Sequence, residues 1–250
     1  MSFYEIVFSP TGGTSKVAGI LAAELGADSA RIDLTEHPSD AELGPDDVAV
    51  IAVPSFGGRV PRTASERIAS LRGGGAHAVL VCVYGNRAFE DTLVELADTA
   101  ESAGFRTVAA VAAVAEHSIA RKIAAGRPDA RDEEALRGLA AQIRLKFESG
   151  DASKPAIPGG RPYKTPGGTG LVPKPTRSCT SCGACARHCP VGAIDPGNPG
   201  CIDKDACISC MRCVAVCPAH AREVNPVKLA AVGAALKKMC AQRREPELFI

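Results

Sequence analysis

Two stretches share one cysteine spacing: Cys179-Thr-Ser-Cys182-Gly-Ala-Cys185-Ala-Arg-His-Cys189-Pro190 and Cys207-Ile-Ser-Cys210-Met-Arg-Cys213-Val-Ala-Val-Cys217-Pro218. In each stretch three cysteines recur at every third position, and a fourth follows just before proline. Three thiolates at this spacing wrap a loop round one iron–sulfur cube, and the fourth is carried away to ligate the other cube. The repeat therefore predicts two [4Fe–4S] clusters held by two interlocked halves.

The predicted ligand sets are Cys179, Cys182, Cys185 and Cys217 for one cluster, and Cys207, Cys210, Cys213 and Cys189 for the other. Zinc ribbons and disulfides are the alternative interpretations. Zinc also uses Cys-x-x-Cys, but its four-ligand sites give no reason for two triplets that each precede Cys-Pro. Cys201 fits neither triplet, and we interpret Cys82 and Cys240 as core or surface thiols, because a free cysteine behaves as a small hydrophobe.

This part of the chain resembles a bacterial-type two-cluster ferredoxin. The resemblance includes Gly183, residues 191–194 after the first Cys-Pro, and the Cys207-Ile208-Ser209-Cys210 opening of the second copy. It implies a small α+β domain whose halves are related by a pseudo-twofold axis, and it covers about a fifth of the chain.

Composition narrows the class of protein. The chain has 250 residues, of which 46% are hydrophobic, enough for one medium and one small domain. We expect a cytoplasmic protein, because the cysteines are motif-spaced and the first residues lack the marks of a signal peptide, and we expect no membrane span. A net charge of +1 and an aromatic content of 4% argue against nucleic acid as a partner.

Residues 1–150 alternate between apolar strand patterns and helical patterns. The expected strands are residues 3–8, 30–34, 48–54, 78–84 and 107–114, and the expected helices are residues 15–25, 63–71, 91–103 and 132–148. Near-continuous apolar strands suit a parallel sheet that is covered on both faces. The pattern predicts an α/β fold with a doubly wound five-stranded parallel sheet, whose ligands bind beyond the carboxyl ends of the strands.

Three further segments follow this first domain. Residues 151–178 are rich in proline and glycine and predict a linker, either free or ordered over the first domain, where Tyr163 and residues 171–172 offer apolar surface. Residues 179–226 hold the cysteine repeat. Residues 227–250 form a last helix and tail, and we interpret the helix's apolar stripe as a packing surface. That stripe consists of Leu229, Val232, Leu236 and Met239.

A loop rich in hydroxyls and glycine follows the first strand: Ser9-Pro10-Thr11-Gly12-Gly13-Thr14. At a helix N-terminus, such a loop makes an anion cradle from backbone amides and from the hydroxyls of Ser9, Thr11 and Thr14, while Gly12 and Gly13 let the backbone close. The order matches neither a Walker loop nor Gly-x-Gly-x-x-Gly. The alternative is a glycine-rich turn without a ligand.

The loop resembles the phosphate loop of flavodoxins, which bind FMN, and the flavodoxin-like strand order would bring two further loops to the same crevice. The resemblance implies FMN contacts from residues that follow the third and fourth strands: Pro54, Ser55, Phe56, Gly57, Gly58 and Arg59, and Tyr84, Gly85, Asn86, Arg87 and Phe89. Phe56 and Tyr84 would grip the ring, with core packing as their alternative role. Flavodoxins usually carry acidic residues near the ring, whereas this chain has Arg59 and Arg87.

Nearly the whole chain resembles single-chain fusions of a flavodoxin-like domain with a two-cluster ferredoxin. Residues 57–61, 116–129 and 161–164 extend the likeness beyond simple flavodoxins. The resemblance implies electron transfer with redox partner proteins. A reductase of a small molecule is the second hypothesis, with Arg59, Asn86, His117 and Ser118 as pocket residues, and a scaffold without a ligand is the third. The sequence leaves open whether His117 lies near the flavin.

Overall fold

The computed structural model describes residues 2–26, 28–167 and 170–250. Five parallel strands form the body of one sheet in the order β2-β1-β3-β4-β5. Their bounds are Phe3–Val7 (β1), Ser29–Asp33 (β2), Val48–Pro54 (β3), His77–Tyr84 (β4) and Arg106–Val114 (β5). This is the flavodoxin-like order of a doubly wound sheet, and it confirms the predicted fold class.

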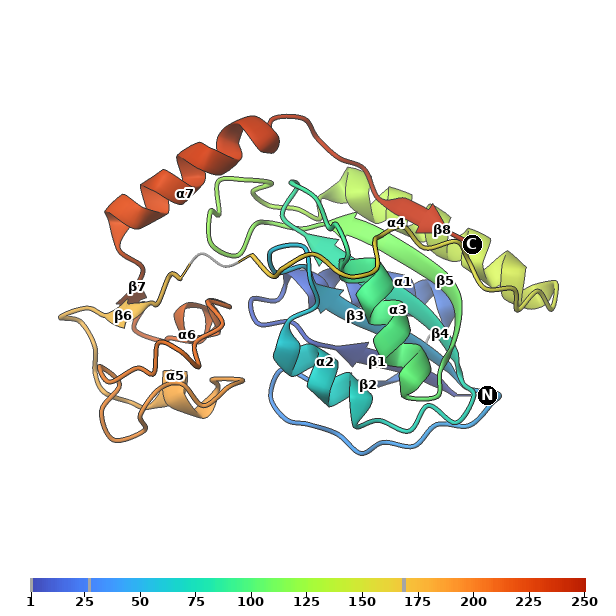
Figure 1. Cartoon of the computed structure of the whole chain (residues 1–250), viewed down its shortest axis with the longest axis horizontal. Helices are drawn as coiled ribbons and strands as arrows, with labels where there is room; N and C mark the ends of the chain where they lie inside the picture. The colour runs from blue at the N-terminus through green and yellow to red at the C-terminus, as the bar shows by residue number, and fades with distance from the viewer. Residues whose placement is uncertain (1, 27, 168–169) are drawn as a thin grey trace.

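Four helices cover the two faces of this sheet, as Figure 1 shows. Their bounds are Gly13–Leu25 (α1), Arg62–Ala69 (α2), Thr92–Ser102 (α3) and Ala130–Glu148 (α4). Alternate residues of a strand point to opposite faces. Ile6 therefore joins the core under α2 and α3, while its neighbour Val7 joins the core under α1 and α4. All four helices were expected within a few residues of these bounds.

The sheet has one strand more than the sequence predicted. Residues Glu247–Phe249 (β8) pair antiparallel with β5, with Leu248 opposite Val111. A three-residue strand after a polar stretch carries too little pattern to be identified in advance. It returns the end of the chain to the first domain (Figure 1). The segment that we expected to be a tail therefore forms an edge strand next to β5.

The proline-rich segment is ordered over α3, which is one of the two arrangements expected for it. Arg161 and Tyr163 both donate to the carboxylate of Asp98, and Lys164 pairs with Glu90. Leu171 is buried, as expected for an apolar anchor. Residues 168–169 of the expected linker lie outside the described residues.

The cysteine-rich part repeats its backbone every 28 residues. Its elements are β6 (Lys174–Pro175), α5 (Ala184–Arg187), α6 (Arg212–Ala215) and β7 (Arg222–Glu223). Positive φ angles recur at matching positions of the two halves: Ser181 and Ser209, Gly183 and Met211, Gly192 and His220. The amide of Ala193 donates to Cys189 Sγ at 3.3 Å, and Ala221 donates to Cys217 Sγ at 3.2 Å. The two cysteine runs thus form equivalent halves.

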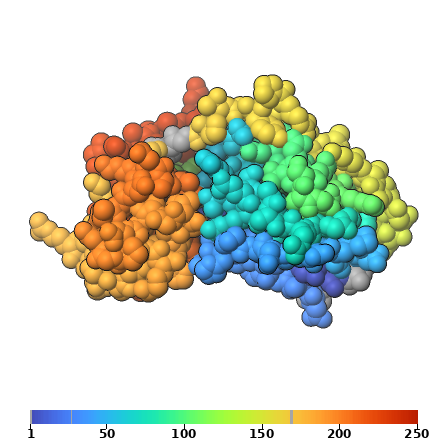
Figure 2. Space-filling view, turned by 60° about the horizontal axis from the view of Figure 1, so that its bottom comes forward, coloured from blue at the N-terminus to red at the C-terminus, as the bar shows by residue number. Residues whose placement is uncertain are grey.

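The cysteine-rich part is seated against the α/β part (Figure 2). Arg67 of α2 donates to the carbonyl of Pro190 at 2.7 Å, and His188 Nδ1 lies 2.9 Å from Glu36. Arg212 of α6 pairs with Glu36 and donates to the carbonyl of Pro10 at 3.3 Å. Helix α7 (Pro226–Met239) then bridges from this part back toward the sheet (Figure 1). None of the helices in the described ranges is long and apolar enough to cross a bilayer.

Candidate functional site

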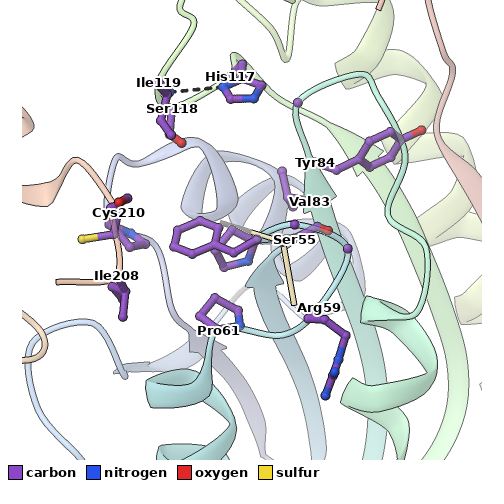
Figure 3. A pocket seen from close by; sticks show the side chains of 18 of the residues that line it. Ser55, Arg59, Pro61, Val83, Tyr84, His117, Ser118, Ile119, Ile208 and Cys210 are labelled. Carbon is purple, nitrogen blue, oxygen red and sulfur yellow. Dashed lines mark hydrogen bonds between the residues drawn. The ribbon is translucent and has the colours of Figure 1, made fainter. Parts of the chain in front are cut away.

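A cavity of about 920 Å³ lies at the carboxyl ends of β1, β3 and β4, where the doubly wound order places its crevice. Figure 3 shows it from close by, with Ser55, Pro61 and Val83 on the side of the sheet and Ile208 and Cys210 on the opposite side. Its size lies within the range of small-molecule and cofactor sites. The cavity is therefore formed jointly by the α/β part and the cysteine-rich part.

The loop after β1 supplies four lining residues, one of which is Pro10. Thr11, Gly13 and Thr14 border the cavity, and Gly12 reaches a φ of 90° just before α1 begins. A Cβ on Gly13 would meet Cβ of Ala115 at 3.0 Å, so the close approach favours glycine there. Ser9 instead supports the loop from beneath, since its Oγ accepts from the amide of Ser15 and its amide donates to Thr35. Of the five expected phosphate ligands, Ser9 and Gly12 do not line the cavity.

The loop after β3 makes a sharp turn and places the aromatic residue Phe56 at the cavity. Gly57 and Gly58 have φ angles of 61° and 86°, and Phe56 and Arg59 exchange backbone hydrogen bonds across them. Two central residues with positive φ define a tight hairpin turn that glycine favours. A Cβ on either glycine would overlap a neighbour, Gly167 or Glu90. Pro54, Ser55, Phe56 and both glycines line the cavity as expected.

The loop after β4 contributes less than expected. The Tyr84 ring packs at 5.4 Å from the Phe89 ring in a small core cluster with Ala112 and Val114, and it points away from the cavity in Figure 3. Burial raises the pKa of the Tyr84 hydroxyl to about 12. Tyr84 is among the residues that line the cavity, but its ring takes the alternative role that the sequence left open, core packing, and Phe89 packs with it. Gly85 does line the cavity.

Asn86 has a structural role that the sequence did not indicate. It is 4% exposed and is absent from the cavity lining. Its side-chain nitrogen donates to the carbonyls of Cys240 and Gln242, both at 2.9 Å, and its oxygen accepts from the amide of Arg244. The side chain of Asn86 therefore clamps the chain between α7 and β8.

The two arginines near the crevice are each neutralised by a carboxylate. Arg59 binds Glu95 through two nitrogens at 2.7 and 2.8 Å, and its guanidinium lies 4.8 Å from the Tyr163 ring centre. Figure 3 shows the Arg59 side chain turned away from the cavity. Arg87 binds Glu90, and the hydrogen bonds from Arg87 and Lys164, with the charges of both, lower the pKa of Glu90 to about 2. Neither guanidinium brings an uncompensated positive charge to the cavity.

His117 lies on the cavity wall, which answers a question that the sequence left open. Its Nδ1 accepts from the amides of Ile119 and Ala120 at 3.2 Å (Figure 3). Burial lowers the pKa of its imidazole below the ordinary value. A neutral ring whose Nδ1 accepts carries its proton on Nε2. Gly85 makes room for this ring, since a Cβ there would meet His117 at 2.5 Å.

Several lining residues were not identified from the sequence, and two groups of them stand out. One is the loop from Cys207 to Cys210, which the sequence assigned only to a cluster. The other is the face of α7, where Val232, Ala235 and Leu236 line the cavity. The apolar stripe of α7 was a real signal, but we expected it to pack, whereas no residue of α7 is buried. Both groups become apparent only in the tertiary structure, which brings them to the same cavity.

Cys189 of the first run borders one small cavity together with Cys207, Cys210 and Cys213 of the second run. Burial raises the pKa of Cys210 to about 12 and that of Cys213 to about 11. Thiols so placed ionise only with a bound cation to compensate them, which fits an iron cluster.

Three cysteines belong to neither predicted ligand set. Cys82 is fully buried in β4, Cys201 is exposed, and Cys240 ends α7 with its Sγ 3.8 Å from the carbonyl of Gly85. Throughout the described ranges, no three side chains of His, Cys, Asp or Glu converge on a site for a single metal ion.

Comparison with known proteins identifies the cysteine-rich part. The family described as "4Fe-4S dicluster domain" matches residues 178–221. Ferredoxin-3 of Chlorobaculum tepidum is 47% identical over 54 residues, which are 19% of this chain and 87% of that protein. Ferredoxin-2 of the same organism is 44% identical over 50 residues, or 17% of this chain and 81% of its own length.

Two solved structures align with the α/β part. A flavodoxin of Streptococcus pneumoniae aligns with a TM-score of 0.40 and 22% identity, over 58% of this chain and 99% of its own. The rubredoxin oxygen:oxidoreductase of Desulfovibrio gigas aligns with a TM-score of 0.39 and 15% identity, over 60% of this chain and 36% of its own.

The ferredoxin matches decide in favour of iron–sulfur clusters over zinc or disulfides, and the strand order gives the fold of the first part. Through residues 178–221 the chain belongs to the ferredoxins with a 4Fe-4S dicluster domain, here fused to an α/β domain of flavodoxin-like topology.

Proposed function

We propose that this chain transfers electrons between two [4Fe–4S] clusters and an FMN held in the same polypeptide. In this proposal residues 1–150 form the FMN domain, 151–178 the linker, 179–226 the two-cluster domain and 227–250 the C-terminal segment. The clusters take the crossed ligand sets given above. FMN takes its phosphate contacts from Thr11, Gly13 and Thr14 and its ring contacts from Phe56 and the backbone at Gly57, Gly58 and Gly85.

One observation carries the proposal: the hydroxyl-rich loop and the second cysteine run line the same cavity. Thr11, Gly13 and Thr14 line it together with Cys207 and Cys210. The set that contains Cys207 and Cys210 therefore belongs to the cluster nearer the flavin. Cys182, in the other run, is exposed to solvent. That exposed loop offers the contact point for an external one-electron partner protein.

A bound flavin would accept two electrons together with protons from water, and these electrons come from two successive one-electron oxidations of the partner. The protein's contribution is to place and hold the groups. The Arg212–Glu36 pair fixes the second cysteine run beside the hydroxyl-rich loop. Helix α7 lays an apolar face over the cavity. His117 presents a neutral Nε2–H donor at its wall.

Cofactor analysis tests the proposal. The full chain, purified anaerobically and supplied with FMN, should contain about eight iron atoms, eight sulfide ions and one FMN. Iron and sulfide in full amount with no flavin bound would reject the flavin half. Stoichiometric flavin with half the iron would reject the second cluster.

A reductase of a small molecule is the second candidate function. Its support is that the cavity continues past the hydroxyl-rich loop to His117, Ser118 and the face of α7, which is room for an acceptor over the flavin. Steady-state turnover of added small acceptors by the reduced protein would favour this function. Transfer to protein carriers alone would favour the electron carrier.

A further inference from the structure

Arg222 is a buried cation in the cysteine-rich part. It lies in β7 and is 4% exposed. One terminal nitrogen donates to Cys185 Sγ at 2.8 Å, and the other donates to the carbonyls of Pro173 and Pro199 at 3.3 and 3.1 Å. Its Nε is buried with no partner. No carboxylate in the described parts of the chain forms an ion pair with it. By contrast, the half-buried Arg59 pairs with Glu95, and the buried Arg127 pairs with Asp132.

A buried charge without a counter-charge is costly, so the partners of Arg222 need an explanation. The guanidinium contacts one predicted cluster ligand directly. A cluster bound by four thiolates carries net negative charge and has sulfide acceptors. Both the missing counter-charge and the missing acceptor for Nε are therefore of the kind that a bound cluster supplies.

The internal repeat shows that this cation is specific to one half. Counting 28 residues back from Arg222 reaches Ile194, just as His220 matches Gly192 and Ala221 matches Ala193. Ile194 is also buried, at 5% exposed, and it forms a backbone bridge with Ile202. One half of the repeat thus places an aliphatic side chain where the other half places a guanidinium.

We propose that Arg222 is an internal counter-ion that raises the reduction potential of the cluster bound by Cys179, Cys182, Cys185 and Cys217 above that of its neighbour. Reduction adds one electron, and hence one negative charge, to the cluster. A fixed cation and an N–H donor on a ligand sulfur both stabilise the reduced form. The hydrogen bond to Cys185 makes the effect larger on that cluster. This inference rests on the proposed ligand sets but not on the flavin.

The test is a redox titration of the anaerobically purified full chain, followed by electron paramagnetic resonance, with iron and sulfide measured in the same samples. Wild type should titrate in two resolved one-electron steps. Arg222→Ile introduces the residue that the other half has at the matching position. It should lower the reduction potential of the higher-potential step. The reduced-to-oxidised ratio of that cluster at a fixed potential should fall at least tenfold, which is about 59 mV for one electron. Arg222→Lys should keep most of the wild-type potential.

Arg144→Met is the matched control, because Arg144 is an exposed cation of α4 in the α/β part and pairs with Glu148 rather than with a cysteine. It should leave both steps in place. Arg222→Ile with full iron and wild-type potentials would overturn the inference, whereas missing iron in wild type would reject the ligand sets instead. If Arg222→Ile loses iron, Arg222→Gln and Arg222→Lys decide. If the Lys variant keeps its iron where the Gln variant loses it, or has a higher potential than the Gln variant, the counter-ion role is supported. If the two variants lose iron equally or have equal potentials, that role is overturned.

Discussion

The carboxylate of Glu36 pairs with the guanidinium of Arg212 across the boundary between the α/β part and the cysteine-rich part. Burial alone would raise the pKa of Glu36, but hydrogen bonds from His188 and Arg212 and the Arg212 charge bring it below the ordinary value. Glu36 is therefore ionised at neutral pH. The pair joins the second cysteine run to the loop that borders the cavity.

Glu36→Gln should loosen this seating, because a neutral amide cannot compensate Arg212. We expect a larger radius of gyration in solution scattering and a several-fold slower transfer from clusters to flavin. Glu42→Gln is the control, since Glu42 pairs with Arg72 on the surface of the α/β part alone. The seating role is wrong if the two variants behave alike.

Cysteine replacements test the crossed ligand sets. Cys189→Ser should damage the cluster of Cys207, Cys210 and Cys213, and Cys217→Ser should damage the other, because each fourth ligand serves the opposite run. Paramagnetic resonance of the reduced proteins, with iron analysis, distinguishes the two. Cys201→Ser, in an exposed residue outside both sets, should leave both clusters intact. Loss of the cluster of the same run in each variant would contradict the crossing.

Thr11→Val with Thr14→Val should weaken FMN binding and leave the clusters intact. A hydrogen bond to a charged group contributes about 1.5–3 kcal/mol, so two lost bonds reduce affinity about 10²-fold or more. Thr107→Val is a matched control, because the Thr107 hydroxyl is buried in β5 without a partner. Calorimetric titration with FMN measures the effect. Wild-type affinity in a folded double variant would remove this loop from the flavin site.

Asn86→Leu should destabilise the chain while sparing FMN affinity. The substitution removes the partners of two carbonyls and one amide between α7 and β8, and buried groups left unpaired cost about 1–3 kcal/mol. Urea unfolding followed by circular dichroism should show the loss. A large drop in FMN affinity with unchanged stability would instead return Asn86 to the flavin contacts that the sequence suggested.

His117 should make stability depend on pH below its ordinary pKa of 6.5. Burial lowers the pKa of His117 in the folded chain. Below pH 6.5 the unfolded chain therefore binds a proton at this residue more readily than the folded chain does. Stability should then rise with pH up to about 6.5 and show no further contribution from His117 above it. Thermal midpoints from pH 5.5 to 8 should lose this slope in His117→Gln and keep it in the control His37→Gln, an exposed histidine. A His117 ring that titrates at or above 6.5 by NMR would contradict this assignment.

Local sequence patterns were enough to predict most of the architecture. The apolar runs of residues 48–54 and 78–84 identify central strands because both faces of a parallel sheet are covered. The 28-residue cysteine repeat identifies the second domain because cluster chemistry fixes its spacing. Strand β8 could not be predicted in the same way, since three residues pair with β5 only after the rest of the fold has formed.

The candidate site was predictable in its loops but not in its side-chain directions. Thr14 follows β1 and Phe56 follows β3, so the topology of the sheet alone brings both residues to the crevice. Tyr84 and Asn86 follow β4 at the same edge, yet one turns into the core and the other clamps the chain after α7. Such choices depend on partners more than 20 residues away, such as Phe249 and Cys240, which no local pattern contains.

Anaerobic stopped-flow reduction with a one-electron donor tests the central claim, that clusters and flavin exchange electrons within one chain. The account predicts that cluster absorbance bleaches first and that a flavin phase follows with a rate constant independent of protein concentration. A flavin rate that rises in proportion to protein concentration would show transfer between molecules and would contradict the shared cavity as the route.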